Sequence, residues 1–176
     1  MNNKQIWEKV KSALDAQALE IDQSSWDLFV SELDRHYDGP QAGATLNLYT
    51  DGAARGNPGP AGIGIVLQDD SGKTVKEHFE YIGEQTNNVA EYMALIRGLA
   101  LAAELGGKEV HVFSDSELMT KQINGEYKVK NRALIDLYAQ ASKSIRNFEN
   151  VRITHVKRNM NSGADRLANM AIDARK

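Results

Sequence analysis

The stretch LNLYTDGAARGNPGPAGIGIVLQ, residues 46–68, carries the strongest evidence about the fold. Apolar and polar residues alternate over Leu46–Thr50, as they do in a half-buried strand. The glycine- and proline-rich run Gly52–Gly62 predicts a turn, and the β-branched run Gly64–Gln68 predicts a second strand. A third extended stretch covers Lys73–Ile82. We therefore expect three consecutive antiparallel strands.

Helical spacing begins after this strand region. Val89, Met93 and Ile96 recur at helical intervals, and Gly106-Gly107 would end that helix. The full order is β-β-β-α-β-α-α-β-α, which predicts an α/β fold with a five-stranded mixed sheet, because strands joined by helices usually pair in parallel. The later elements are predicted at 109–114 (strand), 116–123 and 134–145 (helices), 151–156 (strand) and 163–174 (helix).

The N-terminal part of the chain has a different character. Residues 1–37 show apolar side chains at helical spacing, and Ser24 or Ser25 is a candidate cap for a second helix. The run of residues 38–44 contains Gly and Pro and predicts a linker. We therefore expect an N-terminal helical extension (1–37), a linker (38–44) and a main domain (45–176).

Composition limits the kind of site that the protein can hold. The 176 residues include no cysteine, which excludes a disulfide partner and thiolate chemistry. A metal site would use carboxylates or histidine, and carboxylates suit Mg²⁺ or Mn²⁺. No long apolar run predicts a membrane span, and no secretory signal is evident, so we expect a cytoplasmic protein.

The net charge of −3 conceals an uneven distribution along the chain. Residues 1–44 hold 4 basic and 8 acidic side chains, and residues 45–120 hold 5 and 11. Residues 121–176 instead hold 12 basic and 5 acidic side chains. Such asymmetry is a hint of a nucleic-acid partner.

Four acidic residues occupy positions where ligands gather in sheet-based folds. Asp51 and Asp115 end two predicted strands, and Glu91 and Asp165 lie in the first turns of two predicted helices. Taken singly, each acid is better explained as a helix cap or a solvated strand end. Together they favour a four-carboxylate pocket that divalent cations would neutralise.

The motifs around these acids resemble those of type 1 ribonucleases H. The matching runs are Tyr49–Gly64, Thr86–Glu91, Phe113–Ser116 and Ala164–Ala168, in the family's order. The resemblance spans residues 46–174 and implies the ribonuclease H-like fold. It implies endonucleolytic cleavage of the RNA strand of RNA–DNA hybrids, leaving 5′-phosphate and 3′-hydroxyl ends.

Site residues follow from the same resemblance. It implies that Asp51, Glu91, Asp115 and Asp165 are catalytic and hold two Mg²⁺ or Mn²⁺ ions. It also implies contacts in the hybrid's minor groove by Ala53, Ala54, Asn57, Asn87 and Asn88, and contacts on the DNA side by Ser116 and Gln122. Within the basic C-terminal part of the chain, Lys128 and Lys130 are candidates for phosphate contact.

Two departures from well-studied bacterial members stand out. The region Asn124–Asn131 keeps two lysines but lacks the extra helix of the basic protrusion, as in a shorter archaeal-like branch. The loop Lys157–Gly163 has no histidine, whereas those enzymes carry one before the last acid. His155 precedes this loop, in the predicted strand.

Two other classes of function remain open from the sequence. A non-catalytic nucleic-acid-binding module could use the same fold, since fold alone does not determine function. The acidic N-terminal helices could also serve assembly, by self-association or docking, because their charge disfavours nucleic acid.

Overall fold

The computed structural model describes residues 3–14, 21–37 and 45–174. The chain divides into two compact units, Met1–Gln41 and Ala42–Lys176. In the described part of the chain, no helix is long and apolar enough to cross a membrane. The predicted linker, 38–44, lies outside the described residues.

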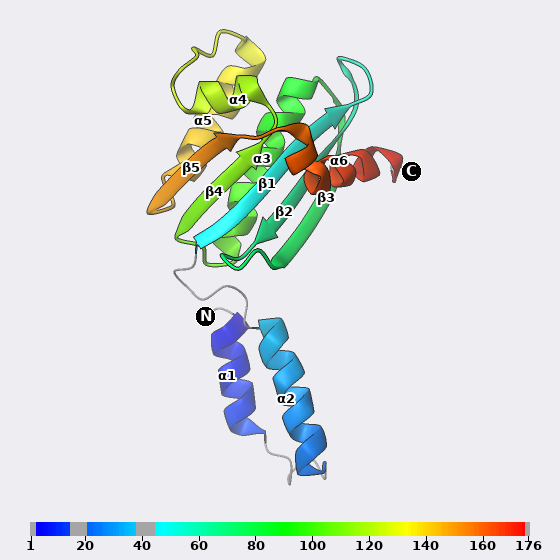
Figure 1. Ribbon diagram of the computed structural model, residues 1–176, viewed down its shortest axis with the longest axis vertical. Helices are drawn as coiled ribbons and strands as arrows, with labels where there is room; N and C mark the ends of the chain where they lie inside the picture. The colour runs from blue at the N-terminus through cyan, green and yellow to red at the C-terminus, as the bar shows by residue number, and fades with distance from the viewer. Residues whose placement is uncertain (1–2, 15–20, 38–44, 175–176) are drawn as a thin grey trace. The chain divides into compact units, whose positions relative to one another are not determined.

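A five-stranded mixed sheet forms the centre of the second unit, in the order β3-β2-β1-β4-β5 (Figure 1). The β1–β2 and β2–β3 pairs are antiparallel, whereas the β1–β4 and β4–β5 pairs are parallel. This confirms the fold predicted from the order of elements. The strands are β1 (Thr45–Ala54), β2 (Gly59–Gln68), β3 (Thr74–Gln85), β4 (Glu109–Ser114) and β5 (Asn150–His155).

Helices cover both faces of this sheet. Leu46 and Leu48 of β1 point to the face covered by α3, where they join the main core. Neighbouring strand positions point to the opposite face, where α6 packs so closely on Gly62 and Gly64 that a Cβ at either would clash with α6. The helices of this unit are α3 (Asn87–Glu104), α4 (Glu117–Ile123), α5 (Arg132–Ile145) and α6 (Ser162–Asp173), with a short 3₁₀ turn, η1 (Arg158–Met160).

The glycine-rich segment differs from its predicted form. The predicted turn, Gly52–Gly62, is mostly strand: β1 continues to Ala54, and β2 already begins at Gly59. The ladder between the strands persists to the pair Ala54 and Ala61, because small residues fit where α3 and α6 approach the strands. Asp51 therefore lies inside β1 and not at its end.

The first unit consists of two helices, α1 (Asn3–Ala13) and α2 (Gln23–Tyr37). The prediction that Ser24 or Ser25 caps the second helix is wrong. Asp22 takes this place, since its carboxylate accepts a hydrogen bond of 3.0 Å from the Ser25 backbone N–H. Among the described residues of this unit, the buried apolar side chains are those of Trp7 and Trp26.

Candidate active site

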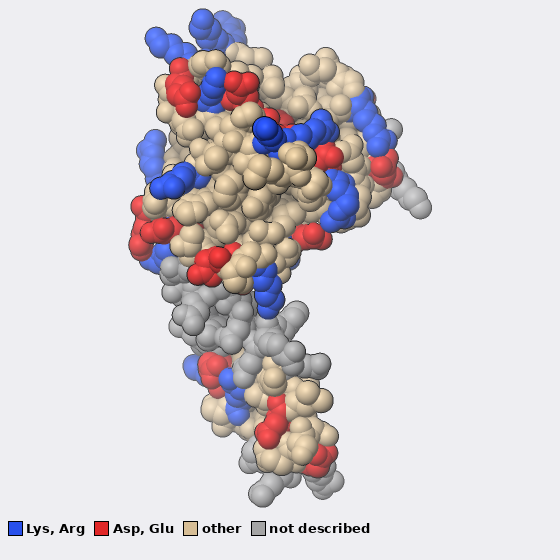
Figure 2. Space-filling view, in the orientation of Figure 1, with Lys and Arg blue, Asp and Glu red and all other residues tan. Residues whose placement is uncertain are grey.

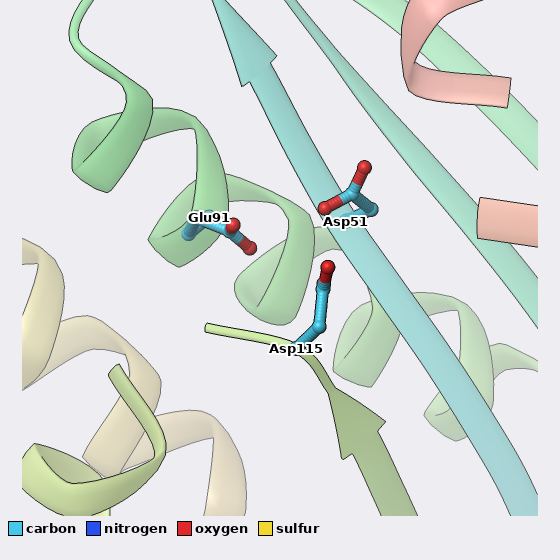
Figure 3. Close-up of side chains that lie close together, drawn as sticks. All are labelled: Asp51, Glu91 and Asp115. Carbon is cyan, nitrogen blue, oxygen red and sulfur yellow. The ribbon is translucent and has the colours of Figure 1, made fainter. Parts of the chain in front are cut away.

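Three carboxylates from distant parts of the chain meet beside the sheet (Figure 3). Asp51 comes from β1, Glu91 from α3, and Asp115 directly follows β4. One carboxylate oxygen of each lies within 4.8 Å of the others. Asp51 and Glu91 are each only 5% exposed. The structure thus brings together three of the four acids that the sequence singled out.

Sheet register explains why two of these acids are neighbours. The parallel pairing of β1 and β4 ends at Tyr49 opposite Phe113. Asp51 and Asp115 each come two residues after this last pair, so they lie at the same level of the sheet. In open sheets, ligand sites form just beyond the carboxyl ends of parallel strands, which is where these two acids lie.

A close helix contact brings in the third acid. A Cβ on Gly52 would lie 2.2 Å from the backbone nitrogen of Glu91, so only glycine lets α3 pack this tightly on β1. Thr86 caps α3 by accepting a hydrogen bond from the Val89 backbone N–H. Capping at Thr86 and contact at Gly52 together position the Glu91 carboxylate over β1.

Burial and mutual repulsion make the cluster electrostatically costly. Loss of solvent raises the pKa of Asp51 to about 7, and the charges of Asp115 and Asp165 add to the rise. Burial also raises the pKa of Glu91 well above its usual value, with further contributions from Asp51 and Asp115. A bound cation would relieve both effects by neutralising the carboxylates.

The donor set fits a divalent cation with a preference for oxygen. All three side chains offer carboxylate oxygens, which Mg²⁺ and Mn²⁺ prefer. Glu91 Oε2 is buried and has no hydrogen-bond partner among the residues that the structure describes. Since buried polar atoms normally have partners, this oxygen is a free ligand position facing the cluster's charge.

Asp165, the fourth acid, lies beside the cluster and is held by a different partner. Its carboxylate Oδ1 is paired with the guanidinium of Arg158, from η1. Asp165 still acts on the cluster, because its charge contributes to the raised pKa of Asp51. The Arg158 charge opposes that rise, so Arg158 partly neutralises the site.

Asn161 is a site residue that the sequence analysis missed. It is 1% exposed, and its Nδ2 donates hydrogen bonds of 2.9 Å to the Thr50 carbonyl and to Asp115 Oδ1. The backbone carbonyl of Asn161 accepts a hydrogen bond from the Asp165 backbone N–H. Its place at the N-terminus of α6, four residues before Asp165, was the signal that could have drawn attention to it.

A cavity of about 480 Å³ opens over the three acids. Arg158 also lines it, so the lining includes a guanidinium group beside the acidic side chains. Of the predicted substrate residues, four line this cavity: Ala53, Ala54, Asn87 and Ser116. These four residues therefore line the same cavity as the three carboxylates.

Two predicted contact residues, Asn57 and Asn88, lie outside the cavity lining. Asn57 belongs to the exposed turn between β1 and β2, and its Oδ1 accepts a hydrogen bond of 3.2 Å from the Asn87 backbone N–H. Asn88 is exposed in the first turn of α3. The Asn57 contact joins the β1–β2 turn to the start of α3.

Two of the three remaining predicted contacts line a second groove. Gln122 and Lys128 line it, together with Tyr127 and Tyr138, and Lys130 is exposed close by in sequence. Gln122 is buried, and its Oε1 accepts a hydrogen bond of 2.9 Å from the Tyr92 hydroxyl. Figure 2 shows Lys and Arg side chains gathered at this end of the molecule, over the segment that joins α4 and α5.

The second unit of the chain, Ala42–Lys176, has clear relatives among known proteins. A family model described as reverse transcriptase-like matches residues 49–171. Ribonuclease HI of Halobacterium salinarum is 42% identical over 134 residues, covering 76% of this chain and 67% of that protein. The crystal structure of LC11-RNase H1 in complex with an RNA/DNA hybrid superimposes with a TM-score of 0.70 at 47% identity, covering 73% of this chain and 96% of that one.

A longer relative matches over the same region. The bifunctional protein Rv2228c of Mycobacterium tuberculosis is 46% identical over 125 residues, or 70% of this chain. The match covers 34% of that relative. The chain thus spans about a third of the length of the mycobacterial proteins it matches.

Proposed function

The chain belongs to the type 1 ribonuclease H family, and from this premise we propose that it hydrolyses the RNA strand of RNA–DNA hybrids. The observation that carries the proposal is the cluster of Asp51, Glu91 and Asp115, with ligand atoms within 4.8 Å of one another. Burying such a cluster costs free energy that mere nucleic-acid binding would not require. A relative solved with an RNA/DNA hybrid supports the choice of substrate.

We propose that the reaction depends on two divalent ions, Mg²⁺ or Mn²⁺, held by Asp51, Glu91, Asp115 and Asp165. When bound, such ions supply an activated water and stabilise the charge that develops at the scissile phosphate, leaving 5′-phosphate and 3′-hydroxyl ends. The chain's own contribution is to fix the carboxylates before metal arrives. Glu91 offers an unpartnered oxygen, and Asn161 orients Asp115 through its side-chain amide.

We propose that the hybrid lies across the cavity and reaches the second groove. Ala53, Ala54, Asn57, Asn87 and Asn88 would face the minor groove, where the 2′-hydroxyls distinguish RNA from DNA. On the DNA side, Ser116 lines the cavity and Gln122 lines the second groove. Lys128 and Lys130 are exposed and would neutralise backbone phosphates.

We assign the activity to residues 45–176 and a separate role, self-association, to residues 1–37. The N-terminal helices lie outside the match to the family model, which begins at residue 49. Their acidic balance disfavours contact with a phosphate backbone. The cysteine-free composition supports a reducing, cytoplasmic location.

A metal-titrated cleavage assay tests the proposed activity. The full chain is incubated with matched RNA–DNA hybrid, duplex RNA and a duplex with a single ribonucleotide, over a range of Mg²⁺ and Mn²⁺. We expect cleavage of the hybrid's RNA strand that chelator abolishes and that Asp51→Asn lacks. Binding of the hybrid without cleavage, unaffected by chelator, would instead identify a non-catalytic binding module.

A further inference from the structure

The α1–α2 unit leaves a stripe of apolar side chains uncovered. Ile6 and Val10 lie on one side of α1, and Leu14, directly after the helix, continues the same four-residue spacing. The three side chains are 37–43% exposed. On α2, Phe29 is 49% exposed, although its ring lies 5.9 Å from that of Trp26. The spacing of Ile6, Val10 and Leu14 places these three side chains on one continuous surface of the helix.

This unit is too small to be stable on the apolar contacts that it makes within itself. Its buried apolar side chains, among the residues described, are Trp7 and Trp26, which are 6% and 9% exposed. Units of about 40 residues usually need metals, disulfides or oligomerisation to fold stably. The apolar surface on each helix is wider than one neighbouring helix covers, as in helices that belong to larger bundles.

Charge distinguishes the kind of partner that this surface fits. The sequence of α1 is basic, because it contains three lysines, Lys4, Lys9 and Lys11, and one acid, Glu8. The sequence of α2 is acidic, because it contains three acids, Asp27, Glu32 and Asp34, and one arginine, Arg35. Figure 2 shows this difference over the described side chains of the two helices. The unit therefore carries both halves of a complementary charge pattern.

We propose that the apolar stripe binds the same stripe of a second copy of this chain, forming a four-helix bundle. A two-fold interface is self-complementary, and the charges favour the arrangement in which the basic α1 of one copy faces the acidic α2 of the other. This inference deepens the self-association proposed for residues 1–37 and is independent of the cleavage reaction.

Sedimentation equilibrium of the full chain, with and without 0.5 M salt, tests the proposal, using about 0.1–50 µM protein to span typical dimer affinities. The wild type should sediment with twice the mass of one chain at the upper concentrations. Val10→Glu and Phe29→Glu place a charge in the interface and should each raise the dissociation constant about 100-fold or more. Val10→Ile, which keeps the apolar contact, should remain dimeric.

Ser24→Glu is the matched control. Ser24 is exposed on α2 and lies about 200° around the helix from Trp26, so its substitution should leave the dimer intact. A wild type that stays monomeric throughout overturns both the interface and self-association. A dimer that persists in Val10→Glu and Phe29→Glu overturns this interface alone. Hybrid cleavage, measured on the same samples, reports separately on the proposed activity.

Discussion

Asn161 and Asp115 are joined by a hydrogen bond of 2.9 Å, in which the Asn161 side-chain Nδ2 donates to a carboxylate oxygen. The same Nδ2 donates to the carbonyl of Thr50, the residue before Asp51. One buried amide therefore links the loop before α6 to both strands that carry clustered acids. This contact acts as an outer-shell support for the candidate metal ligands.

Replacing Asn161 by alanine should raise the metal concentration that cleavage requires and have a smaller effect on the stability of the fold. The Asp115 carboxylate would lose its orienting donor, and the buried Thr50 carbonyl would lose its partner. We expect the Mn²⁺ concentration for half-maximal cleavage to rise about 10- to 100-fold. The free energy of unfolding should fall by about 1–3 kcal/mol. Metal-titrated cleavage and urea unfolding measure the two effects.

Asn131→Ala is the matched control for that experiment. Asn131 caps α5, a helix that carries none of the four acids, by accepting a hydrogen bond of 2.9 Å from the Ala133 backbone N–H. Its loss should lower stability by about 1 kcal/mol without altering the metal requirement. An equal metal shift in both variants would contradict a positioning role for Asn161.

Without metal, the protein should lose stability as the pH rises from about 4 to 7. The pKa of Asp51 is 3.8 when unperturbed and about 7 in the fold, so the folded state binds more protons in this interval. Stability therefore falls with rising pH, by about 4 kcal/mol from Asp51, and levels off above pH 7. Glu91 contributes in the same direction, because burial raises its pKa as well.

Urea unfolding in chelator at a series of pH values measures this loss. Asp51→Asn removes one titrating group and the repulsion that it exerts, so its stability should depend much less on pH than that of the wild type. Added Mn²⁺ should restore wild-type stability at pH 8 but not that of the variant. Identical pH profiles for the two proteins would show that Asp51 is not the titrating group.

Removing Arg158 should tighten metal binding while weakening hybrid binding. Its guanidinium is paired with Asp165 and lowers the pKa of Asp51, so it competes with a cation for the same negative charge. We expect Arg158→Ala to bind Mn²⁺ severalfold more tightly in calorimetry and to show a higher KM for the hybrid. Arg97→Ala is a suitable control, because Arg97 lies 3.9 Å from Glu80 beside a different cavity. Weaker Mn²⁺ binding by Arg158→Ala would rule out this competition.

A methyl group at Gly52 should separate Glu91 from the other acids. The added Cβ would overlap the Glu91 and Ala90 backbone, and α3 would have to move away from β1. Gly52→Ala should cost about 1–3 kcal/mol of stability and abolish calorimetric Mn²⁺ binding.

Gly163→Ala, in α6, is the control for Gly52→Ala. Its added Cβ would meet only Val66 Cγ2, at an ordinary 3.5 Å, and alanine is the better helix former. This variant should gain about 0.5–1 kcal/mol and keep its metal binding. Retained Mn²⁺ binding in Gly52→Ala would disprove the proposed role of the tight β1–α3 contact.

Local pattern was sufficient to predict most elements of the fold. The β-rich run Glu109–Ser114 predicted β4 with its observed bounds, and the helical spacing that includes Val89 predicted α3, which begins at Asn87. The glycine-rich turn was placed too broadly, because its small residues are also what strands need where helices pack closely. Composition cannot separate these two uses of glycine.

The sequence by itself determined the order of elements, the family resemblance and the carboxylate chemistry, because all three depend on residue types and their spacing along the chain. Only the tertiary structure decided which carboxylates meet. Asp51 and Asp115 become neighbours through the parallel register of β1 and β4, whereas Asp165 pairs with Arg158. It also revealed Asn161, whose two hydrogen bonds join segments far apart in sequence. Such contacts depend on packing, which local spacing does not encode.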